Sequence, residues 1–393
     1  MKACSVYALD NQILVASQDE NVKILFVIRS LERGGAERQL CMLAKELCNR
    51  GHQVEICTFY RSEGYGALLD DTNVTVRSLD KTTRWNVLGV VFRFFRMLYV
   101  SKPMIIHGYL PTGNILAALG RIVLPHAKIV FGVRAATMHL EMYDRFSRWV
   151  YAVERKLSSH ADLVIANSDQ GAEIYRAFGA NTVVIYNGID TEHFRPDKGA
   201  GEDLGKSWAE SADQIIVGMV ARIDPIKDHE TFFRAAKILL DQGVNVKFVC
   251  IGGGSPIRRE SLKQIASDLG ITKHLVWAGE ISNMLSCYNA LDIITLASKG
   301  EGFPNVIAEA MACGVLPVAS RVGGVPNLIG DTGWVVPVGD AIALRDAWLE
   351  ILSLDEEEKK RMIANMRSKI LEKYSVGFLA QNTETILGVG LKN

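Results

Sequence analysis

Short runs of consecutive apolar residues recur along the chain, and the segments between them carry apolar residues three and four positions apart. The first run, residues 22–28, ends at a glycine turn, and residues 40–47 then follow a helical pattern. Continuous apolar runs are typical of strands buried on both faces of a parallel sheet. The pattern predicts a strand–helix–strand unit with a right-handed crossover. Further strands are predicted at residues 54–57, 104–106, 129–131, 163–166 and 183–185.

A second series of such runs follows a polar stretch, residues 197–213, which we interpret as a linker. Its predicted strands are residues 215–220, 246–251, 275–277, 293–296 and 316–319. Two series of this size predict an α/β protein with two Rossmann-like, doubly wound domains, residues 21–195 and 196–373, facing each other across a cleft. Ligands of such sheets bind at the carboxyl ends of the strands, so the loops that follow strands are the candidate binding loops.

Composition restricts the class of protein. The chain has 393 residues, of which 48% are hydrophobic, so it can bury two cores and is not a disordered chain. Basic and acidic residues both total 44, and the zero net charge argues against a general nucleic-acid binder. The charge is unevenly distributed, because residues 81–140 hold eight basic residues and no acidic ones.

Cysteines and apolar runs bear on the cellular compartment. The seven cysteines are scattered, with no CxxC pair and no zinc-site spacing, as is typical of core thiols in the reducing cytoplasm. Residues 1–20 lack the features of a signal peptide, and we expect them to form an N-terminal extension. Because no run of about 18 uncharged apolar residues occurs, we expect no membrane-spanning helix.

Residues 298–317 carry the richest pattern of candidate chemistry. They predict a glycine-containing loop with Glu301, followed by a helix with Glu309. Both carboxylates can reach a ligand above the helix N-terminus, where backbone amides and the helix dipole favour a phosphate or sugar oxygen. The residues of this loop and first turn are Gly302, Phe303, Pro304 and Asn305. Taken alone, Glu309 could equally be an exposed helical glutamate.

Two further loops after predicted strands suit a diphosphate. Arg222 and Lys227 follow the strand at residues 215–220 and can clamp a diphosphate, arginine as a planar fork and lysine as a point charge. A glycine run with Gly253 and Gly254 follows the next strand and permits close approach of a phosphate. The alternatives are solvated surface cations and a plain glycine turn, since the run lacks both G-K-[ST] and the third glycine of GxGxxG.

These loops follow strands of one domain and so lie on one edge of its sheet. The combination resembles the retaining family-4 glycosyltransferases of the GT-B fold (glycosyl transferases group 1). The family's motif has two glutamates separated by seven residues and preceded by an Arg-x-x-x-x-Lys loop, and the resemblance spans roughly residues 22–375. The matching segments are Glu301-Gly302-Phe303-Pro304-Asn305, Glu309-Ala310-Met311-Ala312 with Gly314, Gly34-Gly35-Ala36-Glu37-Arg38 and Asn187-Gly188-Ile189-Asp190.

The resemblance implies an activity. A sugar would move, with retention of anomeric configuration, from a nucleoside diphosphate sugar, which we expect to be UDP-linked, to a glycan or lipid-linked acceptor. The implied context is bacterial surface polysaccharide or lipopolysaccharide biosynthesis. The resemblance implies no metal ion and no other cofactor, in agreement with the absence of a DxD motif. It also implies that a C-terminal helix within residues 374–393 packs back on the first domain.

The resemblance further implies roles at matching positions. Arg222 and Lys227 would hold the donor diphosphate, Glu309 would bind the ribose hydroxyls, Glu301 would bind the donor sugar, and Gly35 would let the first domain approach the diphosphate. The nucleotide-sugar site would then consist of Gly35, Arg222, Lys227, Gly253, Gly254, Gly279, Glu301, Gly302, Phe303, Pro304, Asn305 and Glu309. The candidate catalytic residues are Glu301, Arg222, Lys227 and His107.

The first domain departs from the family in one respect. Many relatives carry a histidine in a loop after a strand, near the reacting carbon. The comparable strand here, residues 128–133, ends in Arg134 instead. His107, after the strand at 104–106, is the other acceptor-side candidate facing the cleft, and His139 has less support. His107 could equally have only a packing or hydrogen-bonding role.

Two aromatic and basic stretches of the first domain predict a membrane contact. Residues 87–98 form an amphipathic helical pattern with arginines on one side, and residues 143–156 mix the same residue types. Because such helices suit the surface of anionic lipid, we hypothesise peripheral binding to the inner face of the cell membrane. The arginines concerned are Arg84, Arg93, Arg96, Arg145 and Arg148. The alternative is a core helix with snorkelling arginines.

Three other functions are weighed against this one. A nucleotide-sugar epimerase shares the fold, but the Glu301 and Glu309 motif disfavours it. A nucleotide-binding oxidoreductase is disfavoured because its GxGxxG is missing. A catalytically silent binding subunit is disfavoured because Arg222 and Lys227 accompany both glutamates. We therefore predict a glycosyltransferase that binds no nucleic acid.

Overall fold

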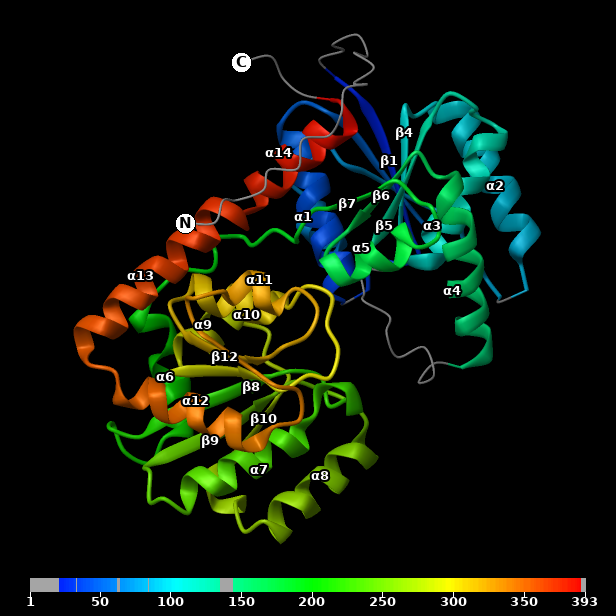
Figure 1. Cartoon of the computed structure of the whole chain (residues 1–393). Coiled ribbons are helices and arrows are strands. Elements are labelled where there is room, and N and C mark those ends of the chain that lie inside the picture. Colours follow the sequence, from blue (N-terminus) through cyan, green and yellow to red (C-terminus); the bar gives the residue numbers. More distant parts are fainter. Residues whose placement is uncertain (1–20, 33, 62–63, 84, 135–143, 390–393) are drawn as a thin grey trace.

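The structure is a computed structural model that describes residues 21–32, 34–61, 64–83, 85–134 and 144–389. The predicted N-terminal extension, Arg84 and His139 lie outside the described residues. The described chain forms two α/β domains, each built on a parallel sheet (Figure 1). The predicted fold class is therefore confirmed.

In the part of the chain that the structure describes, the first domain contains a sheet of seven parallel strands in the order β3-β2-β1-β4-β5-β6-β7. The strands are β1 (Lys23–Ile28), β2 (Gln53–Thr58), β3 (Thr75–Ser78), β4 (Ile105–Tyr109), β5 (Lys128–Val133), β6 (Leu163–Ala166) and β7 (Thr182–Val184). The sequence pattern does not predict β3, because this strand lies at the sheet edge, is largely exposed and contains no apolar run.

Helices cover both faces of the first sheet. They are α1 (Gly35–Asn49), α2 (Val87–Ser101), α3 (Leu110–Leu119), α4 (Arg145–Leu157), α5 (Asp169–Arg176) and α14 (Val376–Leu387). α1 and α14 share one apolar core with the sheet, to which Leu43 and Leu379 contribute. α2, α3 and α5 share a second core on the other face, to which Phe94, Leu116 and Ala172 contribute, and α4 packs against α3.

The second domain contains, within the described residues, a sheet of six parallel strands in the order β10-β9-β8-β11-β12-β13. The strands are β8 (Ile215–Val220), β9 (Val246–Ile251), β10 (Leu275–Gly279), β11 (Ile293–Leu296), β12 (Leu316–Ser320) and β13 (Trp334–Val336). The strand order reverses between β8 and β11, and the loops after these strands are where such sheets bind ligands.

The helices of the second domain correct one prediction. They are α6 (Lys198–Trp208), α7 (His229–Leu240), α8 (Pro256–Asp268), α9 (Met284–Asn289), α10 (Asn305–Ala312), α11 (Val325–Ile329), α12 (Ala341–Ser353) and α13 (Glu356–Lys373). The stretch 197–213 is therefore not a linker, because α6 occupies most of it and packs against α9. The Asp197 side chain caps the helix, and Trp208 is buried in the core of the domain.

Short 3-10 helices complete the description of the fold. They are η1 (Tyr65–Leu69), η2 (Gly120–Ile122), η4 (Ser158–His160), η5 (Pro225–Lys227) and η6 (Thr272–His274). Among the described residues, no helix combines the length and the apolar character needed to cross a membrane.

The chain passes from the first domain to the second near residue 190 and returns near residue 375, and these two crossings lie side by side (Figure 1). The amide of Ile189 donates to the carbonyl of Tyr374 at 2.7 Å, and the amide of Val376 donates to the carbonyl of Ile189 at 3.1 Å. The buried side chain of Gln39 on α1 bonds both the amide and the carbonyl of Gly188, at 2.9 and 2.8 Å. The crossing point is thus fastened to α1.

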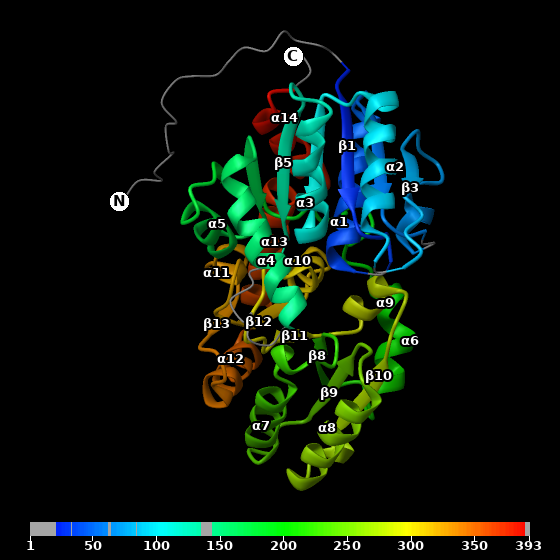
Figure 2. The same cartoon turned by 90° about the vertical axis from the view of Figure 1, so that its right-hand side faces the viewer.

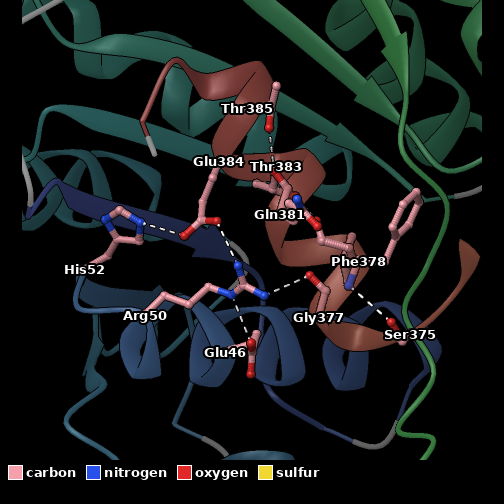
Figure 3. A network of polar contacts seen from close by, with 11 residues as sticks. Glu46, Arg50, His52, Ser375, Gly377, Phe378, Gln381, Thr383, Glu384 and Thr385 are labelled. Atoms are coloured by element: carbon pink, nitrogen blue, oxygen red, sulfur yellow. Dashed lines mark hydrogen bonds and ion pairs between the residues drawn. The ribbon is translucent and has the colours of Figure 1, made fainter. Parts of the chain in front are cut away.

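Polar contacts fasten α14 to the first domain (Figure 3). The Arg50 guanidinium donates to a carboxylate oxygen of Glu384 and to the carbonyl of Gly377, both at 3.1 Å, and to Glu46 at 2.9 Å. The His52 ring lies 3.1 Å from the other carboxylate oxygen of Glu384. The chain therefore leaves the second domain through α13, and α14 packs against α1 and against His52, which precedes β2.

Candidate functional site

Loops after strands of both sheets meet at the boundary between the domains, where the first domain lies above the second in Figure 2. Asn187 donates a hydrogen bond of 2.8 Å to the side-chain oxygen of Asn305 at the start of α10. A Cβ atom added to Gly302 would lie 2.9 Å from the side-chain oxygen of Asn167 and 3.2 Å from the carbonyl of Arg134. The first domain therefore approaches the backbone of the predicted donor loop so closely that any larger residue would require a shift of the loop or of its neighbours.

Lys227 and Glu301 form an ion pair. Lys227 ends η5 after β8, Glu301 lies in the loop after β11, and the ammonium is 2.6 Å from a carboxylate oxygen. The Ser298 hydroxyl donates to the same oxygen at 2.6 Å. The loops are also joined through their backbones, because the amide of Lys299 donates to the carbonyl of Ile226 at 2.7 Å. Two loops that follow neighbouring strands thus place a cation and a carboxylate at one point.

Arg222 lies just beyond the end of β8 and is exposed to solvent. The next residue, Ile223, pairs with the glycine run, because its amide donates to the carbonyl of Gly253 at 2.7 Å and it forms a bridge with Gly254. This pairing brings the backbone of the Arg222 loop next to that of the glycine run. An anion bound at the end of β8 can therefore meet both a guanidinium and glycine backbone.

The glycine run also contacts the end of β10. The amide of Gly252 donates to the carbonyl of Gly279, the last residue of β10, at 2.7 Å. The carboxylate of Glu280 lies directly against Gly253, where an added Cβ atom would overlap it. Three carboxyl-edge loops therefore converge beside Arg222, as the sequence predicts for consecutive loops on one sheet edge.

Glu309 is buried on α10, with 2% of its surface exposed, so the alternative of an exposed helical glutamate is wrong. Its carboxylate accepts a hydrogen bond of 2.7 Å from the Tyr288 hydroxyl. It also forms an ion pair with Arg38 of α1, which comes from the other domain. A buried carboxylate needs such partners, because removing a charge from water is unfavourable unless the charge is paired or hydrogen-bonded.

The N-terminus of α10 is held by aromatic packing. Phe303 is buried, and its ring centroid lies 5.9 Å from that of Tyr186 and 5.6 Å from that of Tyr374. Pro304 precedes the helix and needs no amide partner. A Cβ atom added to Gly35, at the start of α1, would lie 3.4 Å from the side-chain nitrogen of Asn305. The glycine loop of the first domain thus lies next to the first turn of α10.

Arg134 is held in place at the end of β5. Its guanidinium lies 4.6 Å from the ring centroid of Tyr109, donates to the Tyr109 hydroxyl at 2.7 Å and donates to Asn187 at 3.3 Å. Asn187 in turn contacts Asn305, so Arg134 is linked through one side chain to the N-terminus of α10. Arg134 is therefore connected to the predicted donor site.

His107 lies elsewhere than predicted. It is in the middle of β4, which continues to Tyr109 because residues 105–109 pair with β5, and none of its surface is exposed. Its ring packs against Phe26 and Tyr109, with centroids 5.2 and 4.9 Å apart. Burial, together with the charge of Arg134, holds the pKa of His107 well below its usual value. The prediction of a loop histidine facing the cleft is therefore wrong, and the packing alternative describes His107.

The arginines predicted to contact a membrane differ in their surroundings. Arg93 donates to the backbone carbonyls of Leu79 and Asp80, at 2.6 and 3.3 Å, and so forms part of the domain's own structure. Arg96, Arg145 and Arg148 are exposed. The same helices and their approaches also expose large apolar side chains. These are Trp85, Leu88, Phe92, Tyr99, Val100, Phe146 and Trp149, each at least 60% exposed.

Three side chains of this region were not singled out as site residues from the sequence, namely Arg38, Tyr288 and Ser298. Arg38 is the last residue of the family-like segment Gly34-Gly35-Ala36-Glu37-Arg38, and this position is what could have indicated a role in the site. Ser298 opens the segment 298–317 without being assigned a role there, and its hydroxyl bonds Glu301 three residues later. Tyr288 lies in no motif, and the fold alone brings it to Glu309. Among the residues that the structure describes, no group of three or more His, Cys, Asp or Glu side chains is placed to hold a metal ion.

Two family models match the chain. Residues 33–193 match the model "Glycosyltransferase Family 4", and residues 202–369 match "Glycosyl transferases group 1". The D-inositol 3-phosphate glycosyltransferase of Saccharomonospora viridis is 30% identical over 210 residues, covering 49% of this chain and 48% of the relative. The D-inositol 3-phosphate glycosyltransferase of Mycobacteroides abscessus is 33% identical over 209 residues. The chain thus spans about half the length of these two curated relatives.

Other relatives match over most of the chain. The GalNAc-alpha-(1->4)-GalNAc-alpha-(1->3)-diNAcBac-PP-undecaprenol alpha-1,4-N-acetyl-D-galactosaminyltransferase of Campylobacter jejuni is 28% identical over 363 residues, covering 88% of this chain and 93% of the relative. The Anabaena protein HepE, solved in complex with UDP and glucose, superposes with a TM-score of 0.80 at 22% identity, covering 93% of this chain and 99% of HepE. With two matching family models and this shared architecture, the chain belongs to the family-4 glycosyltransferases of the GT-B fold.

Proposed function

We propose that this protein moves a sugar from a nucleoside diphosphate sugar to a glycan or lipid-linked acceptor, with retention of anomeric configuration. The observation that carries the proposal is the contact of Lys227 with Glu301, which joins a cation and a carboxylate from loops on both sides of the strand-order switch. A cation at this place suits a diphosphate, and a carboxylate suits sugar hydroxyls.

In the proposed donor complex, Arg222 and Lys227 bind the diphosphate, and the N-terminus of α10 adds backbone amides and its dipole. The diphosphate draws Lys227 away from Glu301, and Glu301 then accepts hydrogen bonds from the sugar hydroxyls. Glu309 accepts hydrogen bonds from the ribose hydroxyls and keeps its bond from Tyr288. The buried position of Glu309 supports this role, since a buried carboxylate is a strong acceptor.

In the proposed reaction, the bond between the anomeric carbon and the diphosphate oxygen breaks while the acceptor oxygen bonds the same face of that carbon. The proton of the acceptor hydroxyl passes to an oxygen of the leaving diphosphate. The negative charge that develops on the diphosphate is stabilised by Arg222, Lys227 and the helix dipole. We propose that these groups suffice without a metal ion or other cofactor, and unchanged activity in EDTA is the test.

Relatives suggest which donor and acceptor to test first. HepE was solved with UDP and with UDP-glucose, so UDP-linked sugars come first. The Campylobacter jejuni relative is named for an undecaprenol-linked acceptor, and a Staphylococcus aureus relative is named as a capsular polysaccharide biosynthesis glycosyltransferase. These names support bacterial surface polysaccharide or lipopolysaccharide biosynthesis as the proposed context.

We also propose that the first domain rests on anionic lipid at the cytoplasmic face of the membrane. The support is the exposed aromatic side chains of α4, where Phe146 and Trp149 stack with centroids 6.1 Å apart beside Arg145 and Arg148. In a flotation assay, anionic vesicles should recover more protein than neutral ones, and Trp149→Ser should reduce the recovery. Phe178→Ser, at another exposed aromatic residue of this domain, is the control.

Thermal unfolding with UDP, GDP, ADP and CMP tests the donor site. A ligand that binds the native state raises stability by mass action. We expect one nucleoside diphosphate to raise the melting temperature of the wild type but not of Lys227→Ala, and a shift that survives the substitution would contradict the assignment. Incubation of the donor sugar without acceptor tests the alternative, because an epimerised product would identify an epimerase.

A further inference from the structure

Two side chains cover the carboxylate of Glu309, which the proposed function assigns to the ribose of the donor. One of its oxygens, Oε2, accepts the Tyr288 hydroxyl at 2.7 Å, and the other, Oε1, pairs with the guanidinium of Arg38. Only 2% of the residue is exposed. Because the carboxylate is both paired and buried, a ribose hydroxyl can reach it only if one of these two partners moves.

Arg38 is the partner that can move. Tyr288 is wholly buried in the core of the second domain, whereas 22% of the Arg38 side chain is exposed. The guanidinium lies 5.9 Å from the ring centroid of Phe194, whose ring in turn packs edge-on against Tyr288 at 5.7 Å. Tyr288 could leave only by opening this core. A long arginine at its margin can instead turn its charged end into water.

The ion pair of Arg38 with Glu309 stands next to the proposed donor site. α1 begins at Gly35, where an added Cβ atom would lie 3.4 Å from the side-chain nitrogen of Asn305 at the start of α10. Arg38 and Glu309 each lie about one turn further along their helices. The pair therefore joins the first turns of two helices from different domains, where the proposed donor complex places the nucleotide.

The domain boundary keeps other contacts when this ion pair opens. Asn187 of the first domain donates to Asn305 at 2.8 Å, and Asn327 of α11 donates to Asp169 of α5. Neither contact involves the ion pair. Release of Arg38 is therefore a local change at the ribose position and does not require the domains to separate.

We infer that Arg38 is an autoinhibitory gate on the donor site, which the ribose hydroxyls of a nucleoside diphosphate open by taking its place on Glu309. The inference rests on the proposed function, because it requires Glu309 to bind the ribose. It deepens that function by naming a contact that regulates the site. Without nucleotide, α1 is fastened to α10, and nucleotide binding releases this fastening.

Such a gate has a thermodynamic signature. An ion pair that exists only in the nucleotide-free protein stabilises that state and not the complex. Substitution of Arg38 must then destabilise the nucleotide-free protein more than the complex, and by linkage the variant must bind the nucleotide more tightly by the same factor. An ion pair kept in the complex would stabilise both states equally and leave the affinity unchanged.

Calorimetric titration of the full chain with UDP tests the inference. The test variant is Arg38→Met, which keeps a long side chain and removes its charge. We expect UDP to bind this variant at least about fivefold more tightly than the wild type, the lower end of the usual range for coupled sites. The second probe is 2′,3′-dideoxyuridine diphosphate, which has no ribose hydroxyl to offer Glu309. It should bind the wild type and the variant equally.

Arg50→Met is the matched control. Arg50 stands at the opposite end of α1 from Gly35, is 27% exposed, and pairs at 3.1 Å with the nearly buried carboxylate of Glu384 (Figure 3). Its loss should lower the melting temperature equally with and without UDP and leave the affinity for UDP unchanged. Arg38→Lys is a milder second variant. It keeps a cation beside Glu309 and should bind UDP with an affinity between those of the wild type and Arg38→Met.

Three results would overturn the inference. Equal affinity of the wild type and both Arg38 variants for UDP would show that the ion pair persists in the complex. Weaker binding by Arg38→Met would show that Arg38 holds the nucleotide instead of opposing it. Equal tightening for UDP and for the dideoxy nucleotide would show a general effect of charge, with no exchange at Glu309.

Failure of the gate can be told apart from failure of the proposed function. If no nucleotide changes the melting temperature of the wild type or of Arg38→Met, the donor assignment itself fails. If the nucleotide shift depends on Lys227 but is the same in the wild type and in Arg38→Met, the donor site stands and only the gate fails.

Discussion

At the carboxyl edge of the second sheet, Lys227 and Glu309 each pair with an opposite charge. At the same edge of the first sheet, Arg134 and Lys81 contact aromatic rings, and the exposed side chains of Arg61 and Asp80 pair with each other. In the second domain Lys227 pairs with Glu301, and Glu309 pairs with Arg38 from across the boundary. In the first domain Arg134 lies over Tyr109, and Lys81 lies over Tyr60. The two edges therefore differ in what a ligand must displace.

The difference indicates how each edge meets its substrate. A donor that binds at the second edge must replace built-in ion pairs, so binding can reorganise Lys227 and Glu301 together. An anion that binds next to Arg134 or Lys81 at the first edge would meet a cation that lies over an aromatic ring. Each of the following predictions tests this division, from the largest expected effect to the smallest.

Replacing Lys227 should have the largest effect on activity. Lys227→Ala removes a cation placed where diphosphate charge develops, and we expect kcat/KM to fall roughly 10²- to 10³-fold, as for the loss of one preorganised electrostatic contact. Lys237→Ala, at a half-buried lysine of the same domain paired with Asp241, should leave kcat/KM unchanged. A comparable loss in both variants would mean that net charge, not position, matters.

Replacing Arg38 should affect stability more than any change at the first edge. Arg38→Ala leaves the buried carboxylate of Glu309 without its cation, and we expect the free energy of unfolding to fall by about 2–3 kcal/mol, less than for a fully buried pair because 22% of the Arg38 side chain is exposed. Tyr288→Phe removes a neutral donor to the same carboxylate and should lower it by about 1 kcal/mol. Urea unfolding measures both, and an Arg38 effect no larger than that of Tyr288 would argue against the ion pair.

A buried histidine should make the second domain sensitive to acid. Burial, with the charge of Arg258, lowers the pKa of His229 to about 4, so between about pH 6.5 and 4 the unfolded chain binds more protons than the folded one. Stability is therefore full above pH 6.5 and falls as the pH drops, by about 2 kcal/mol at pH 5. His229→Gln should flatten this part of the profile in urea unfolding at pH 7 and 5. An unchanged slope would show that other groups cause the acid sensitivity.

Adding one methyl group should disturb the contact between the two edges. Gly302→Ala places a Cβ atom 2.9 Å from the side-chain oxygen of Asn167 and 3.2 Å from the carbonyl of Arg134, so either the loop or these neighbours must shift. We expect kcat/KM to fall about tenfold, since small misplacements of a catalytic loop are costly. Gly66→Ala, where an added Cβ meets nothing within 4 Å, is the control. Full activity of Gly302→Ala would show that the boundary is looser than described.

Removing the buried imidazole in the middle of β4 should have the smallest effect. His107→Leu keeps an apolar side chain among Phe26 and Tyr109, and we expect kcat to change by less than about threefold, because the ring is wholly buried. A general base would contribute about 10²- to 10⁴-fold. A loss of that size in steady-state kinetics, with normal stability, would restore His107 as a catalytic residue.

The sequence predicted some elements well and others poorly, for identifiable reasons. β8, β9 and β11 occupy the predicted residues, since their apolar runs are buried on both faces. The sequence pattern predicts a linker where α6 lies, because most residues of this helix are polar. Its Trp208 packs into the core, but a single buried residue gives no helical apolar pattern. β4 extends beyond its prediction because His107 and Gly108 interrupt the apolar run while the backbone continues to pair.

The candidate site, like the fold, has features that the sequence predicted and features that only the tertiary structure decided. The sequence by itself determined the two-domain α/β fold and which residues of the second domain stand in loops after strands, because strand runs and family motifs are local patterns. The tertiary structure alone decided that Glu309 is buried and paired with Arg38, and that His107 is sealed inside β4. Burial and pairing between domains depend on which segments meet in space, and residues 271 positions apart, such as Arg38 and Glu309, leave no local pattern of that meeting.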